Sequence, residues 1–306
     1  MRNSLSLLLL LAVLIPCYAQ KTDLTLNLEK GKEYRQTVNS EATSVQELMG
    51  QKLEIAMKVE NEIVYKVLNV SSSDCDLEVR YENMQIRAEQ PHGSLVYSSE
   101  NPDAQDLLST MLNKLTGIVY NIKLSKNGQV LEIENLNSAL EQMFDDLSHF
   151  PEAQLVPIKT QILSTYSEEV LKNSFELISP FYPDYSVGVG DIWDAATEVY
   201  SEMGLLAVTA EYELVELGDD FVRVKSISET ATKNRDDYLE TGGMEIKFDI
   251  TGSTVSEFKL DRKTGWIIEA NKSQVMERNT ETKGNPTFPG GMVIPIKVKT
   301  EVVITN

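Results

Sequence analysis

The chain has 306 residues, of which 42% are apolar, 25% charged and only 7% aromatic. This composition is typical of globular proteins rather than of disordered, fibrous or polytopic membrane proteins. The 47 acidic residues outnumber the 28 lysines and arginines, and the formal charge of −19 would repel nucleic acids and anionic membrane surfaces. We therefore expect no nucleic-acid partner.

The sequence opens with a short apolar segment. Arg2 precedes a run at 5–15 that is apolar except for one serine, and Cys17 and Ala19 are small residues at the positions that a signal peptidase requires. The run is shorter than the roughly 20 apolar residues of a membrane-spanning helix. We expect 1–19 to be a signal peptide and the mature chain to be exported, periplasmic or extracellular, with no transmembrane segment. A lipid anchor at Cys17 is the alternative.

Strand-like alternation dominates the rest of the chain. Apolar residues occupy odd positions from Leu53 to Val67 and even positions from Ile294 to Ile304, with mostly charged residues between them. This period of two indicates strands with one buried and one solvated face. Antiparallel sheets have such faces, whereas parallel sheets are usually apolar on both sides.

Similar strand patterns recur in the same order in the two halves of the chain. Such a collinear match indicates a duplicated β unit, although chance similarity between amphipathic strands is the alternative. The matched segments are 31–34 with 190–193, 65–79 with 212–224, and 123–132 with 259–269.

The spacing of apolar residues changes to a helical one between these halves. One stripe runs from Leu136 to Leu147 and another from Leu155 to Ile178, with Pro157 expected in a first turn. A shorter helix is expected from Leu107 to Leu115.

The predicted fold is α+β and mainly β. It has two related, curved, half-barrel-like antiparallel sheets with helices between and against them. We divide the chain into a signal peptide at 1–19, an N-terminal β unit with a short helix at 20–134, a helical connector at 135–182 and a C-terminal β unit at 183–306.

The sequence contains few groups that could carry catalysis. His92 and His149 are its only histidines, and no zinc-protease motif, nucleophile elbow or phosphate-binding loop is present. Acidic pairs such as Asp145-Asp146 are typical of solvated surfaces, although an acid-pair hydrolase and a calcium site are alternatives. We predict no catalytic residue, no metal site and no cofactor. After loss of the signal, Cys75 would be the single thiol, and we expect a structural role for it.

Aromatic residues after the second helical stripe are the candidate ligand-binding residues: Phe181, Tyr182, Tyr185 and Trp193. Such rings stack on sugars or line apolar pockets. The alternative is that they belong to the core, and this applies above all to Trp193 and to Trp266.

The segments 28–34 (LEKGKEY) and 189–193 (VGDIW) resemble a family of uncharacterised exported proteins from Bacteroidota-type bacteria. The resemblance implies a β-rich exported protein of unknown activity. In architecture, curved sheets with helices against the concave side are similar to periplasmic lipoprotein carriers of the LolA and LolB type.

We therefore expect a non-enzymatic binding protein that holds a lipid or another apolar small molecule between sheet and helices. The alternative is a cell-envelope interaction module that binds another envelope component, either a protein or a glycan.

Overall fold

The computed structural model describes residues 20–306 except 49, 91–92, 101, 103–105, 148–149, 202, 242–243 and 285–290. The predicted signal peptide at 1–19 and both histidines, His92 and His149, lie outside the described residues.

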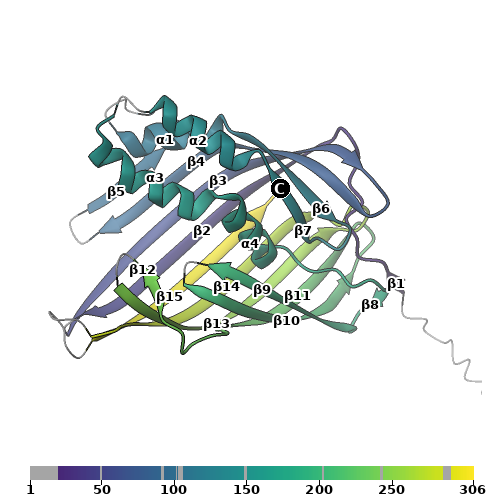
Figure 1. Cartoon of the computed structure of the whole chain (residues 1–306). Coiled ribbons are helices and arrows are strands. Elements are labelled where there is room, and N and C mark those ends of the chain that lie inside the picture. Colours follow the sequence, from purple (N-terminus) through teal and green to yellow (C-terminus); the bar gives the residue numbers. More distant parts are fainter. Residues whose placement is uncertain are drawn as a thin grey trace, which may run out of the picture.

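The described chain is mostly β: strands make up 60% of it and helices 17%. Thirteen strands form one antiparallel sheet in the order β7-β6-β4-β3-β2-β15-β14-β13-β11-β10-β9, with β5 beside β4 and β12 beside β13 (Figure 1). A second, two-stranded sheet pairs β1 with β8. The strands are β1 (Lys21–Thr22), β2 (Glu33–Leu48), β3 (Gln51–Val70), β4 (Asp74–Gln90), β5 (Gly93–Ser98), β6 (Val119–Ser125), β7 (Val130–Glu134), β8 (Val187–Gly188), β9 (Ile192–Ser201), β10 (Gly204–Leu217), β11 (Phe221–Thr232), β12 (Leu239–Thr241), β13 (Met244–Asp261), β14 (Ile267–Thr282) and β15 (Met292–Thr305).

The mainly β, antiparallel fold with helices against the sheet is confirmed. The strands of the two halves share one continuous sheet, because β2 and β15 pair along ten residues, from Ile296↔Gln46 to Thr305↔Thr37. Each of these two long strands would otherwise leave an edge of unpaired backbone N–H and C=O groups. Their pairing satisfies both edges at once.

Two irregularities of the sheet fall at corresponding places in the two halves, whereas the β3–β4 shift between Glu62 and Ile63 has no counterpart between β10 and β11. The β3–β4 register shifts between Val67 and Asn69, and the β10–β11 register shifts between Leu214 and Glu216, which is the same position at an offset of 147. The β6–β7 and β13–β14 registers shift at Leu124 and Leu260. A duplicated β unit would produce such a correspondence. The pairing also sets Cys75, rather than Leu77, as the counterpart of Val222.

Four helices lie against the concave side of the sheet (Figure 1). The stripe predicted at 155–178 is two helices rather than one, because Ser167 adopts an extended backbone, ends α3 and caps α4 by accepting a hydrogen bond from the Val170 N–H. Pro157 lies inside α3 rather than in its first turn. The helices are α1 (Leu107–Thr116), α2 (Leu136–Asp146), α3 (Glu152–Tyr166) and α4 (Glu168–Ile178).

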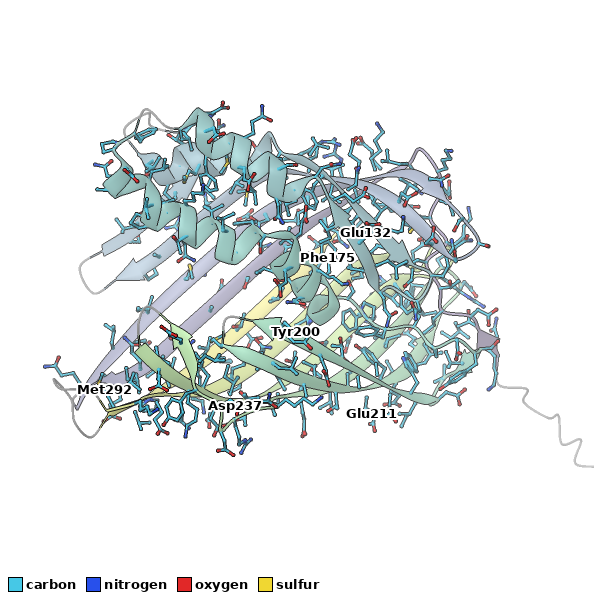
Figure 2. The ribbon with its side chains drawn as sticks, viewed as in Figure 1. Glu132, Phe175, Tyr200, Glu211, Asp237 and Met292 are labelled. Atoms are coloured by element: carbon cyan, nitrogen blue, oxygen red, sulfur yellow. The ribbon has the colours of Figure 1, made fainter. Side chains whose placement is uncertain are left out.

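The hydrophobic core lies between these helices and the sheet. Helix α1 packs on β4 and β5, α2 on β6, and α4 on β7 and β9. Leu112 and Leu140 are fully buried there, whereas Glu132 and Glu211 are exposed on the outer, convex side (Figure 2). Among the described residues, no helix is both long and apolar enough to span a membrane.

Candidate ligand-binding site

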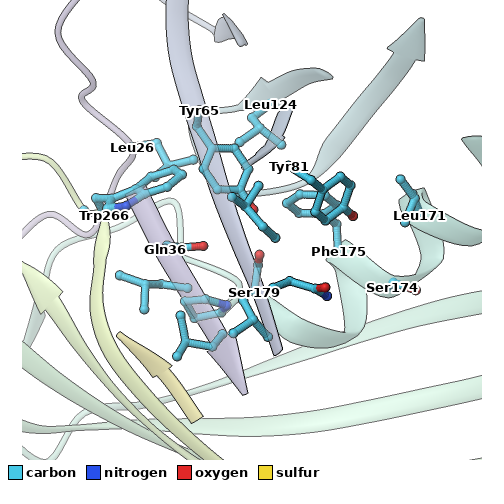
Figure 3. Close-up of a pocket in the computed structure, with 18 of the residues that line it drawn as sticks. Leu26, Gln36, Tyr65, Tyr81, Leu124, Leu171, Ser174, Phe175, Ser179 and Trp266 are labelled. Atoms are coloured by element: carbon cyan, nitrogen blue, oxygen red, sulfur yellow. The ribbon is translucent and has the colours of Figure 1, made fainter. Parts of the chain in front are cut away.

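A cavity of about 160 Å³ lies between α4 and the concave face of β2, β3 and β4. Leu171, Ser174 and Phe175 on α4 face Tyr65 and Tyr81 across it (Figure 3). An apolar cavity of about 150 Å³ is large enough for a benzene-sized molecule. The enclosed space can therefore hold a small ring or the end of an aliphatic chain.

Aromatic rings form much of its wall. The ring centroid of Trp266 lies 5.0 Å from that of Tyr34 and 5.1 Å from that of Tyr65, and the Tyr65 ring meets Phe175 edge-on at 6.2 Å. Such tilted and edge-to-face contacts hold the rings rigidly. The wall is therefore a cluster of rings packed against one another.

The phenol groups around the cavity are neutral at ordinary pH. Burial raises the pKa of Tyr65, Tyr81 and Tyr120 above the ordinary value, because the charged form would lose its water. The hydroxyls of Tyr81 and Tyr120 are hydrogen-bonded to each other. These rings thus offer an uncharged surface.

Two polar atoms in the residues lining the cavity are buried without a hydrogen-bond partner: Asn61 Oδ1, an acceptor, and Trp266 Nε1, a donor. A buried polar atom left unpaired costs about 1–3 kcal/mol, and each one in a folded protein requires an explanation. Asn61 lies four residues along β3 from Tyr65, on which Trp266 packs, so the two atoms are separate candidate contacts for polar groups of a ligand.

Two tight turns close one end of the cavity. Gly128 and Gly265 have φ angles of 89° and 69°, a backbone region that favours glycine. The segment that precedes β2 crosses both turns, with Leu26 N–H bonded to Lys126 O and Asn27 N–H to Thr264 O, both at 2.8 Å. This end wall is held by backbone contacts.

The concave face of the sheet continues beyond the cavity along β3, β2 and β15. Directly paired residues project from the same side of a sheet, so the register places Asn61, Val38 and Ile304 in one row across β3, β2 and β15 at the edge of the cavity. Further along β3, the concave residues Leu53, Ile55 and Met57 are 41%, 44% and 41% exposed. We call these three residues together with Ile296 and Val298 of β15 the aliphatic bed; Ala42, Ser44 and Gln46 of β2 lie between the two strands on the same face.

The four aromatic residues that the sequence singled out occupy different places. Tyr182 lines the cavity and its hydroxyl donates a 2.6 Å hydrogen bond to Gly265 O. Trp193 is buried against Tyr212, with ring centroids 5.7 Å apart, and its Nε1–H donates to Phe181 O at 2.8 Å. Phe181 is half-buried. Tyr185 is 53% exposed, and it lies away from the cavity.

The polar residues of the concave face were not among the residues predicted to bind ligand. Asn61 interrupts the otherwise apolar odd positions of β3, and Lys272 and Arg278 share the even positions of β14 with Ala270 and Met276. A polar residue on a predicted apolar face was the available signal. It could not show which of these residues lie beside a cavity, because the alternation contains no information about pairing across strands.

The remaining reactive groups are inert by their surroundings. Burial raises the pKa of the Cys75 thiol to about 11, and Asp74 and Asp76 contribute less to this shift. The thiol donates to Leu124 O at 3.7 Å. Within the part of the chain that the structure describes, no three His, Cys, Asp or Glu side chains are close enough together to hold a metal ion.

The fold and the cavity define a mainly β protein with an aromatic-walled pocket under a helix. The chain belongs to DUF6263, a family of unknown function whose family model matches residues 72–267. The expected membership in an uncharacterised family is thus confirmed. None of the curated proteins matches the chain.

Several solved structures are weakly similar. Lipovitellin, in a structure described for its lipid–protein interactions, is 10% identical with a TM-score of 0.45; the match covers 92% of this chain and 26% of lipovitellin. An outer-membrane channel of Pseudomonas putida F1 is 6% identical with a TM-score of 0.22, covering 90% of this chain and 97% of the channel. DynF from the dynemicin pathway of Micromonospora chersina is 9% identical with a TM-score of 0.18, covering 95% and 86%. All three TM-scores are too low to define a shared fold.

Proposed function

We propose that the protein is an exported, non-enzymatic binding protein that holds a lipid or another apolar molecule between α4 and the sheet. The observation that carries the proposal is the cavity of about 160 Å³ with two buried, unpaired polar atoms in its wall. Binding pockets typically combine apolar walls with a few polar groups in this way. Of the four aromatic residues expected to bind ligand, Tyr182 is the one that we place in this site.

Export and domain organisation are part of the same proposal. The signal-like segment at 1–19 and the resemblance to exported proteins of Bacteroidota-type bacteria support a periplasmic or extracellular location. The strand order supports β units at 20–134 and 183–306, since each forms a meander of neighbouring strands with the connector 135–182 between them.

The test uses tryptophan emission. Trp193 and Trp266 are the two tryptophans, and Trp266 lines the cavity, so Trp193→Phe leaves one reporter at the site. We expect octan-1-ol to shift the emission of Trp266 in a saturable way. No saturable shift in this variant, and no heat of octan-1-ol binding to the wild type, would overturn the proposal.

A blocking variant locates the binding. Ser174 faces the cavity from α4, whereas Ser138 is exposed on α2, and the hydroxyl of each bonds back to a carbonyl of its own helix or helix cap. In the Trp193→Phe background we expect Ser174→Phe to abolish the octan-1-ol response and Ser138→Phe to leave it unchanged. Circular dichroism checks that both variants fold. Equal binding by both folded variants would place the alcohol elsewhere.

A further inference from the structure

The concave face carries positive charge although the whole chain is strongly acidic. The registers of the described strands place two charged side chains on this face, Lys272 and Arg278, both on β14. The chain contains 47 acidic residues, yet the concave positions of the described strands hold none of them. A ligand lying on this face would therefore meet cations and no anions.

Arg278 differs in its surroundings from the arginines that form salt bridges. Arg35, Arg80 and Arg223 each form salt bridges with glutamates. Arg278 forms none with the described residues: Nη1 contacts Met203 Sδ at 3.1 Å, a weak acceptor, and Nε is buried without a partner.

The neighbours of Arg278 in the sheet do not compensate its charge. The residues paired with it, Ile250 and Ile296, are aliphatic, and burial lowers the pKa of the guanidinium. Since arginine stays charged in proteins, Arg278 is a partly buried cation without an ionic partner among the described residues. An anionic group of a ligand would supply that partner.

The aliphatic bed begins in the same row as this cation. Arg278, Ile296, Gln46 and Leu53 are aligned across β14, β15, β2 and β3. From Leu53 to Met57 the bed runs four residues toward the cavity, a length of about 13 Å. The acyl chains of one bilayer leaflet span a similar distance, about 15 Å.

We propose that the ligand of this site is an amphiphile with one aliphatic chain and an anionic headgroup, a carboxylate or a phosphate, and that Arg278 binds the headgroup. The aliphatic chain of the ligand lies on the aliphatic bed and points toward the cavity. The cavity receives the end of longer aliphatic chains. A guanidinium suits both headgroups because its planar N–H groups match two oxygens at once. Lys272 adds a second positive charge between Arg278 and the cavity. This inference rests on the proposed function, for which it names the class of ligand.

Calorimetric titration with three ligands that share one chain tests the proposal. We expect dodecanoate or dodecyl phosphate to bind the wild-type protein about 10–100-fold more tightly than dodecan-1-ol, the range that corresponds to hydrogen bonds with charged groups. The tighter of the two anions shows whether a carboxylate or a phosphate is preferred. Equal affinity for all three ligands would overturn the inference and leave the proposed function intact, whereas no binding of any would reject both.

Substitutions then test whether Arg278 causes the preference for anionic ligands. We expect Arg278→Gln to remove the preference for the anions while binding of dodecan-1-ol stays unchanged. Lys297→Gln is the matched control, since Lys297 is exposed on the opposite face of the neighbouring strand and pairs with Glu277 at 2.8 Å; it should keep the preference.

Arg278→Met provides a second, independent test of the role of Arg278. Removal of this partly buried charge, whose Nε has no partner among the described residues, should raise the midpoint of urea unfolding of the free protein, while the preference for anions disappears. A preference that persists in both folded Arg278 variants would rule out the role of this residue.

Discussion

At the scale of single residues, backbone conformation decides how the end of the cavity is built. Gly265 has a φ of 69°, and a Cβ atom there would lie 2.3 Å from Thr25 O in the segment that closes the cavity. Gly190 has a similar φ of 88° but no atom within 4 Å of such a Cβ. A side chain at either position would strain the backbone, but only one at Gly265 would also collide with another segment. Comparing the two positions therefore distinguishes the two effects.

We expect Gly265→Ala to lower the free energy of unfolding by about 2–4 kcal/mol, since it adds a backbone clash to the cost of a positive φ. Gly190→Ala should cost only about 1 kcal/mol, the strain alone. Urea unfolding of both variants measures the difference. Equal losses would show that the segment at 20–32 shifts freely to accommodate the methyl group.

At the scale of elements, α4 forms one side of the cavity. The break at Ser167 separates it from α3, and it places Leu171, Ser174 and Phe175 over the sheet (Figure 3). Sequence periodicity predicted the helical stripe, but the break was not predicted, because serine is compatible with both a helix interior and an N-cap. The extended backbone at Ser167 decided between them.

Phe175→Ala should enlarge the cavity and lose the edge contact with Tyr65. We expect a loss of about 2–4 kcal/mol, somewhat less than for a fully buried phenylalanine because Phe175 is only half-buried. Benzene should raise the melting temperature of this variant more than that of the wild type, because it refills the added space and binds only the folded state. A benzene effect of the same size in both proteins would contradict the assignment of Phe175 to the cavity wall.

At the scale of the whole molecule, the buried titratable groups favour neutral and mildly alkaline conditions. Burial raises the pKa values of Tyr65, Tyr166 and Tyr182 above the ordinary value and that of Cys75 to about 11. Their stabilising contribution is complete below the unfolded pKa values, about 8.5 for cysteine and 10 for tyrosine. It is lost as the pH rises, because the unfolded chain then releases protons that the folded chain retains.

Lys272 acts in the opposite direction. Burial lowers the pKa of Lys272 to about 8. Its effect on the free energy of unfolding therefore becomes more stabilising as the pH rises from about 8 to the unfolded pKa of about 10.4. Between pH 8.5 and pH 10 the effects of Cys75 and Lys272 oppose each other. Above pH 10 several phenols oppose one lysine, so we expect the urea midpoint to fall between pH 10 and pH 11. A constant midpoint over this range would show that the phenols are accessible to water in the folded protein.

The sequence alone determined the local properties of this protein. Alternation from Leu53 to Val67 and from Ile294 to Ile304 was sufficient to predict strands and the side chains that share a face, because side-chain direction in a strand depends only on the neighbouring residues. It did not predict that Leu53, Ile55 and Met57 of that face are exposed. The helical stripes and the acidic net charge could also be predicted from the sequence without the tertiary structure. Only the tertiary structure decided that β2 pairs with β15, that Tyr182 reaches the cavity whereas Tyr185 does not, and that Arg278 shares a row with Leu53. These features depend on strand pairing and packing between residues far apart in the chain, which no local pattern specifies.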